Sequence, residues 1–115
     1  MKIKNVWFEK MNEVGELQKV VMPARTSFFL KNVMAIMQKE AKSFFEKKKE
    51  IMSNHSNGNG KIPPENSMAF LKEMNDIYNE EIEVEISKMD IRIDDLPNLS
   101  IAQIDFIEPF FNIQG

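Results

Sequence analysis

Apolar residues along this chain of 115 residues follow two different periods. Between Ala24 and Met52 there is no Gly or Pro, and apolar residues recur every three or four positions. They are Leu30, Val33, Met37, Ala41, Phe44 and Ile51. This spacing predicts an α-helix over residues 24–52, about 44 Å long. Because a small core cannot cover a helix of this length, we expect neighbouring helices or a second subunit to cover part of its stripe.

Two shorter helical patterns flank this stretch. Asn5 is a suitable N-cap for a helix over residues 6–21, and Pro23 interrupts the chain after it. Its apolar face consists of Trp7, Met11, Val14, Leu17 and Val21. After a turn at residues 53–64, which holds two Asn-Gly pairs and two prolines, a helix is predicted over residues 65–81. Its apolar face consists of Phe70, Leu71, Met74, Ile77 and Tyr78.

Near residue 85 the period changes to two, which is typical of strands. The alternation predicts strands over residues 82–86 and 89–94, with a change of parity at Ser87-Lys88 that allows either one bulged strand or two strands. Ser100 and Gln103 form a capping-box pattern that predicts a short helix over residues 101–108. The end of the chain, from this helix onwards, is apolar and should dock on the core; its apolar residues are Phe106, Ile107, Phe110, Phe111 and Ile113.

These patterns predict a single α+β domain over residues 1–115. It is mainly α, with a long antiparallel helical hairpin made by residues 24–52 and 65–81 and with the N-terminal helix packed beside it. A small β-sheet comes from residues 82–94, and residues 2–4 are a candidate third strand.

The composition is that of a folded globular protein, with 43% hydrophobic and 29% charged residues. There is no cysteine, which excludes disulfides, thiolate metal sites and cysteine nucleophiles. No apolar run approaches the roughly 20 residues of a membrane span, and the N-terminus lacks the apolar segment of a signal peptide. We therefore expect a cytoplasmic protein that does not associate with membranes.

Charge is distributed unevenly along the chain. Residues 1–61 carry 12 Lys or Arg and 6 acidic residues, whereas residues 62–115 carry 3 and 12. We interpret this as two halves that fold against each other, or against the halves of a second copy in a homodimer. The alternative is a basic nucleic-acid surface masked by an acidic tail.

Candidate catalytic and metal-binding residues were sought among the acids and the single histidine. Alternation places Glu83 and Glu85 on the solvated face of a strand, where nothing orders a metal ion. His55 falls in the predicted turn without a nearby carboxylate, so we interpret it as a surface-loop residue. We expect no catalytic residue, no metal site, no cofactor and no enzymatic activity.

The one basic cluster contains Lys39, Lys42, Lys47, Lys48 and Lys49. Glu40, Glu46 and Glu50 lie three or four positions from several of these lysines, so we expect mutual screening along the helix. The cluster nevertheless provides the candidate partner-binding residues Lys47, Lys48 and Lys49. Glu83 and Glu85, on a strand whose edge could accept another strand, are the other two.

Several landmarks resemble a group of small proteins from tailed phages and prophages of Gram-positive and related bacteria. They are MKIK at the N-terminus, Pro23-Ala24-Arg25, the turn GNGKIPPEN, Phe70 with Tyr78, the strand EIEVEI and the closing LSIAQIDFIEPF. That group has no established activity, so the resemblance implies a phage-encoded accessory protein and assigns no site residue.

The expected function is therefore non-enzymatic binding of a protein partner by a phage-encoded accessory protein in the host cytoplasm. Inhibition of a host or defence factor is one such role, and an assembly chaperone or a minor virion component is another. A nucleic-acid-binding protein that uses the Lys39 to Lys49 face is the alternative from a different class.

Overall fold

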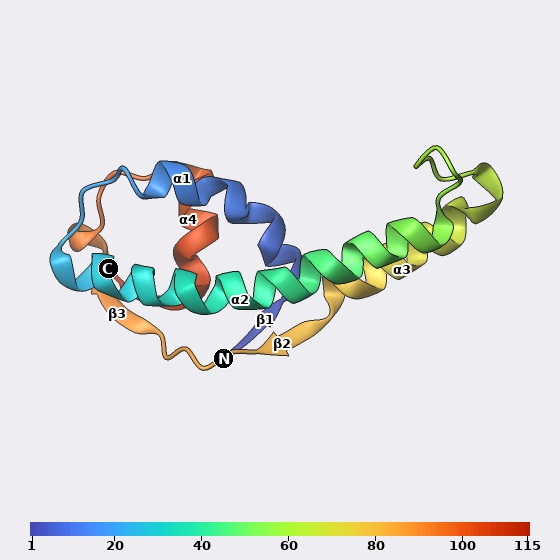
Figure 1. Ribbon diagram of the computed structural model, residues 1–115. Coiled ribbons are helices and arrows are strands. Elements are labelled where there is room, and N and C mark those ends of the chain that lie inside the picture. Colours follow the sequence, from blue (N-terminus) through green and yellow to red (C-terminus); the bar gives the residue numbers. More distant parts are fainter.

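The computed structural model describes the backbone of residues 1–115 and every side chain except that of Glu13. The fold is α+β and mainly helical, with two separate sheets of two strands each. Figure 1 shows a body on the left, from which an arm projects to the right. The molecule measures 52 × 25 × 23 Å, and its radius of gyration is 17.2 Å. A compact domain of this length has a radius of gyration of about 13 Å, so the arm makes the molecule markedly elongated.

Helix α2, Ala24–His55, runs through both the body and the arm. Five of the six apolar residues predicted on its stripe are buried: Leu30, Val33, Met37, Ala41 and Phe44. The helix extends three residues beyond the predicted end at Met52, because the turn residues as far as His55 still have helical hydrogen bonds. Its first half covers the body, and its second half lies along helix α3 in the arm.

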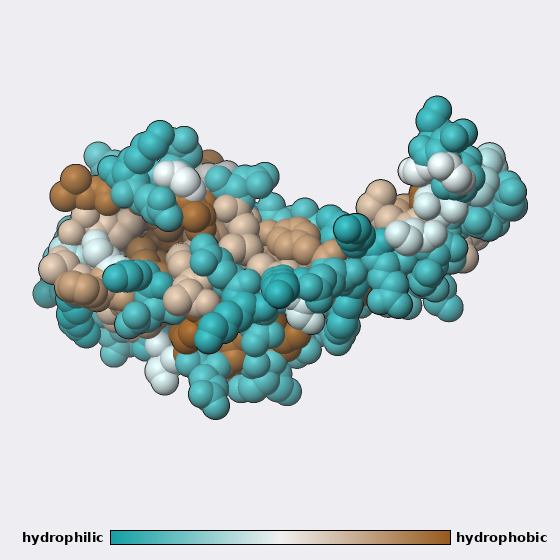
Figure 2. Space-filling model, viewed as in Figure 1, coloured by the Kyte–Doolittle hydropathy of each residue, from teal (hydrophilic) through white to brown (hydrophobic). Residues whose placement is uncertain are grey.

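The arm, as we define it, comprises residues 45–79. It contains the end of α2, a loop, the 3-10 helix η2 (Pro64–Asn66) and α3 (Ser67–Asn79). Helix α3 is shorter than the predicted segment 65–81, since its first residues form η2 and its last residues begin strand β2. In the view of Figure 2 the arm is mainly hydrophilic, and apolar side chains gather over the body.

The prediction of an α-helix over residues 6–21 is wrong for most of this segment. Residues Asn5–Glu13 form the 3-10 helix η1, and only Val14–Leu17 form the α-helix α1. A 3-10 helix has three residues per turn, so residues three apart lie on one stripe. In η1, Asn5, Phe8 and Met11 follow this spacing and face the core, and Trp7, next to Phe8, is buried as well. Val21, predicted on the apolar face, is instead 89% exposed.

The two sheets differ from the predicted single sheet of residues 82–94. Strand β1, Lys2–Lys4, pairs antiparallel with β2, Glu81–Glu83, with Ile3 opposite Ile82. Strand β3, Met89–Arg92, pairs in parallel with β4, Phe111–Gln114. The two predicted strands therefore never pair with each other. Residues 84–88 connect them. The Ile86 N–H donates to the Val84 carbonyl (2.9 Å), and this tight turn ends the extended segment that begins with β2.

The C-terminal third returns to the body. After the 3-10 helix η3 (Ile93–Asp95), helix α4 (Ile101–Ile107) begins with the predicted capping box of Ser100 and Gln103. The 3-10 helix η4 (Glu108–Phe110) then leads into β4. Most of the apolar tail is thus buried in the core, as Phe106, Ile107, Phe110 and Phe111 show, whereas Ile113 is 38% exposed.

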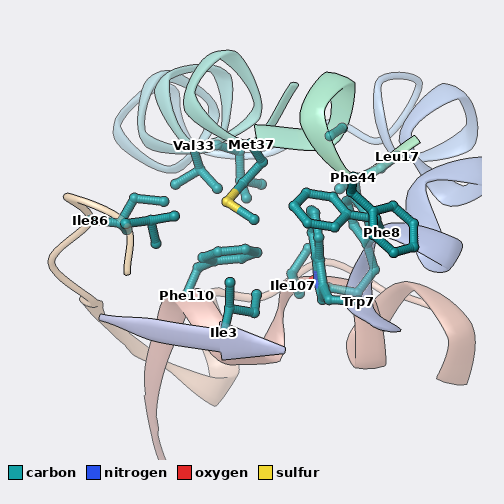
Figure 3. Close-up of a cluster of buried hydrophobic side chains, with 14 of the residues drawn as sticks. Ile3, Trp7, Phe8, Leu17, Val33, Met37, Phe44, Ile86, Ile107 and Phe110 are labelled. Atoms are coloured by element: carbon teal, nitrogen blue, oxygen red, sulfur yellow. The ribbon is translucent and has the colours of Figure 1, made fainter. Parts of the chain in front are cut away.

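Trp7 belongs to the buried hydrophobic cluster that Figure 3 shows. Its ring stacks on Phe106 with a centroid distance of 4.9 Å and meets Phe110 edge-on at 5.3 Å. The indole Nε1 donates a hydrogen bond to the Phe106 carbonyl (2.9 Å). Phe8 stacks on Phe44 of α2 at 5.3 Å and so joins η1 to the long helix. These contacts build one core from elements at both ends of the chain.

Candidate functional site

The arm is held together along its length by contacts between α2 and α3. Near the body, Phe44 packs against Tyr78 with a centroid distance of 5.9 Å. Near the tip, His55 Nε2 lies 3.0 Å from Glu73 Oε2, and the Asn66 side chain donates to the His55 carbonyl (3.0 Å). The interpretation of His55 as a loop residue without a nearby carboxylate is therefore wrong. It occupies the last turn of α2, and it packs edge-on against Phe70 at 6.3 Å.

Three elements meet where the arm leaves the body. Lys48 Nζ of α2 donates to Glu9 Oε1 of η1 (2.6 Å), and the Tyr78 hydroxyl of α3 donates to the same oxygen (3.0 Å). The hydrogen bond from Lys48 is the main reason why the pKa of Glu9 lies below its ordinary value of 4.5, against the opposing effect of partial burial. The same bond raises the pKa of Lys48 above 10.5. Both groups are therefore held in their charged forms.

One side of the arm carries apolar side chains that its own chain leaves exposed. On α2, Phe45 and Met52 are seven residues apart and therefore lie on one stripe, with exposures of 42% and 44%. On α3, Leu71 is 62% exposed and lies seven residues before Tyr78. Lys48 Nζ reaches the rings of both helices, 5.8 Å from Phe45 and 5.6 Å from Tyr78. The two stripes therefore share one side of the arm, which we call the apolar face: Phe45, Lys48, Lys49, Met52 and Leu71.

Leu71 was predicted to lie on the buried face of its helix together with Phe70, Met74, Ile77 and Tyr78. Only Met74 and Ile77 are buried, and Leu71 faces solvent. The helical period identified the side of α3 that is apolar, but it did not show how little of that side α2 would cover.

The arm also carries an acidic groove. Its volume is about 670 Å³, and it is lined by Lys47, Glu50, Ile51, Asn54, Glu73, Asp76, Ile77, Asn79 and Glu80. Lys47 Nζ lies 3.7 Å from Glu80 Oε1 across this groove. Among the described residues, no group of three or more His, Asp or Glu side chains has the arrangement of a metal site. The acids therefore give the groove a negative charge without a metal-binding geometry.

The structure separates the five predicted partner-binding residues. Lys47 faces the acidic groove, whereas Lys48 and Lys49 line the apolar face. Glu83 ends strand β2, where its carboxylate lies 3.3 Å from the N-terminal ammonium of Met1. Glu85 is exposed in the tight turn after β2. The structure thus brings Lys48 and Lys49 together on the arm and leaves the two glutamates on the body.

The ion pairs that two of these lysines form lead out of the helix, and the expected mutual screening along the helix stays a prediction. Lys47 pairs with Glu80 of the segment after α3, and Lys48 pairs with Glu9 of η1. No ion pair between two described side chains of α2 is formed. The sequence did not identify Glu9 and Tyr78 as contacts of Lys48. Glu9 lies 39 positions before Lys48 in the chain, and Tyr78 lies 30 positions after it. No local signal marks such a meeting point.

Among the described side chains, no buried nitrogen or oxygen lacks a hydrogen-bond partner. Within the part of the chain that the structure describes, no helix has the length and apolar character needed to cross a membrane. The chain matches no protein-family model, no curated protein and no solved structure. The geometry of the described chain is therefore the basis for a functional proposal.

Proposed function

We propose that this protein is non-enzymatic and acts by binding another protein through its arm, an antiparallel helical hairpin. The observation that carries this proposal is the apolar face, where Phe45, Met52 and Leu71 are exposed on an element that projects from the body. Apolar and aromatic side chains with a basic rim are typical of the buried centre of protein interfaces.

The surface of the molecule supports the same proposal. A compact protein of 13.4 kDa exposes roughly 6,500 Å², whereas this chain exposes 7817 Å². The excess is expected for a projecting arm. A standard interface buries about 800 Å² on each partner, so an arm of two helices provides enough area for one.

We place this activity in a phage-encoded accessory protein of the host cytoplasm, which the landmarks of the sequence support. The partner would be a host or defence factor that the protein inhibits, or a virion protein that it escorts or joins. A second copy is the other protein that could cover the apolar face. In that case light scattering at micromolar concentration should give about twice the monomer mass of 13.4 kDa.

One observation favours the alternative of nucleic-acid binding. Lys39, Lys42 and Lys49 are exposed, and none of them pairs with a described acidic side chain. Their charge is therefore free to contact phosphates. Binding by this route should weaken steeply with salt and be lost when Lys39, Lys42 and Lys49 are changed to Glu. The absence of a gel shift at low salt would exclude it.

The experiment that tests the arm is a comparison of two variants in affinity capture from host cells. In the arm variant, Met52 and Leu71 are changed to Gln, which keeps helix propensity and removes apolar area. The matched control is Phe28→Gln on the body, because Phe28 is 67% exposed on the same helix α2. A partner that binds the arm should be recovered with the wild-type protein and the control and lost with the arm variant. Recovery with all three proteins would reject the arm as the binding surface.

A further inference from the structure

The body carries a trough that the function of the arm does not use. It lies between the segment that follows η1 and the first half of α2, and its volume is about 480 Å³. Leu17 and Leu30 form its buried floor, and Val14, Met22 and Met34 form half-buried walls. Small-molecule sites typically have volumes of about 300–1,000 Å³ and a mainly apolar lining, as this trough does.

The walls of the trough are fixed before any ligand binds. On one side they belong to the long helix α2, which the core holds in place. On the other side, the Val20 N–H donates to the Leu17 carbonyl (3.1 Å) and the Gln18 N–H donates to the Val14 carbonyl (3.0 Å). A preformed trough loses little conformational entropy when it is filled.

The charge at the rim favours an anionic ligand. Lys31 lies at the rim, and none of the lining residues whose side chains the structure describes is acidic. Of the cationic residues in the first half of α2, residues 24–39, Lys31 lines the trough, whereas Arg25 and Lys39 lie outside its lining. Glu16, on the other side, lies 3.7 Å from Lys19, which balances its charge. An anion at the mouth of the trough would therefore meet a positive potential.

We propose that this trough binds an anionic amphiphile, a medium-chain alkyl carboxylate, with its chain on the leucine floor and its carboxylate on Lys31. Burial of the chain supplies the affinity, since each methylene removed from water contributes about 0.8 kcal/mol. The ammonium of Lys31 fixes the orientation and selects the charge of the head group. This site is on the body, so it does not depend on the proposed function of the arm.

Methionine methyl groups report directly on the site. Met22 and Met34 line the trough, whereas Met52 and Met68 are exposed on the arm. We expect decanoate, kept below its micellar concentration, to shift the methyl NMR signals of Met22 and Met34 saturably and to leave those of Met52 and Met68 unchanged. Equal shifts of all four signals, or no shift at Met22 and Met34, would overturn the proposal.

Exchange of charge tests the assignment of the head group. In Lys31→Glu, decanoate should bind about fivefold or more weakly, because an exposed ion pair is lost and a repulsion replaces it. The same variant should bind the cationic decyltrimethylammonium more tightly than the wild-type protein does. The control Lys39→Glu makes the same change of charge outside the lining and should alter neither affinity by more than about twofold. Equal effects of Lys31→Glu and Lys39→Glu would overturn the role of Lys31.

A third variant tests the trough itself. Ala35 is exposed at the rim, so Ala35→Trp places a large ring over the opening without disturbing the core. Decanoate should then no longer shift Met34, while unchanged signals of the buried Met37 and Met74 confirm that the protein is folded. Unchanged binding to Ala35→Trp would contradict the location of the site.

Discussion

Lys48 Nζ of α2 lies 2.6 Å from Glu9 Oε1 of η1, and this ion pair fastens the arm to the body. The Tyr78 hydroxyl of α3 donates to the same carboxylate oxygen, so one acceptor connects three helical segments. The direction of the arm therefore depends on a polar contact at its base as well as on the aromatic packing of Phe44.

Replacement of Lys48 should cost more stability than replacement of its neighbour. Lys48→Met removes the partner of Glu9, and we expect a loss of about 1 kcal/mol in the free energy of unfolding. Lys47→Met removes only an exposed pair at 3.7 Å and should cost about 0.5 kcal/mol or less. Urea unfolding followed by circular dichroism measures both variants. Equal losses would show that the contact of Lys48 with Glu9 does not stabilise the fold.

The same ion pair should make stability depend on pH in the acidic range. The pKa of Glu9 is lower in the folded protein than its ordinary value of 4.5, so the unfolded chain binds the proton more readily. The stabilisation by Glu9 is therefore present above about pH 4.5 and is lost as the pH falls through the lower folded value. The wild-type protein should be more stable than Glu9→Gln at pH 6, and the difference should shrink towards pH 3. A difference that is constant between pH 6 and pH 3 would contradict this assignment.

Phe106 should be among the most costly residues to truncate. It is fully buried, stacks on Trp7 and presents the carbonyl that accepts the indole hydrogen bond. Phe106→Ala should lower the free energy of unfolding by about 3–5 kcal/mol and expose Trp7, which shifts its fluorescence to longer wavelength. Ile101→Ala, on the exposed side of the same helix, should change stability by less than about 0.5 kcal/mol. Similar losses for both variants would mean that α4 does not pack as described.

The sequence predicted the parts of the fold whose signals are local. The beginning of α2 after Pro23, its buried stripe and the capping box of Ser100 with Gln103 all depend on residues a few positions apart. The N-terminal segment was misread because its core-facing residues fit two periods. Trp7, Met11, Val14, Leu17 and Val21 fit the period of an α-helix, whereas the spacing of three in Asn5, Phe8 and Met11 is that of η1.

The parts that the sequence did not predict depend on distant contacts. Strand β3 finds its partner 22 positions later, in Phe111–Gln114, whose alternation of apolar and polar residues is only four residues long. The alternation at Val84 and Ile86 correctly indicated that both side chains are buried. It did not indicate which strands pair with each other. The apolar face of the arm was also hidden, because Leu71 fits the helical period of a buried face equally well. Its exposure follows from how little of the apolar side of α3 is covered by α2, which buries Met74 and Ile77 but not Leu71.

The central claim, that the arm is the surface that binds a protein, is tested most directly by site-specific photo-crosslinking in host cells. The photoreactive benzoylphenylalanine replaces Leu71 on the arm or Phe28 on the body, two apolar residues with similar exposures of 62% and 67%. If the arm binds a protein, a discrete crosslinked species should form from position 71. The yield of this species from position 28 should be at least severalfold lower. A species that forms from position 28 and not from position 71 would show that the arm is not the binding surface, as would equal yields from both positions.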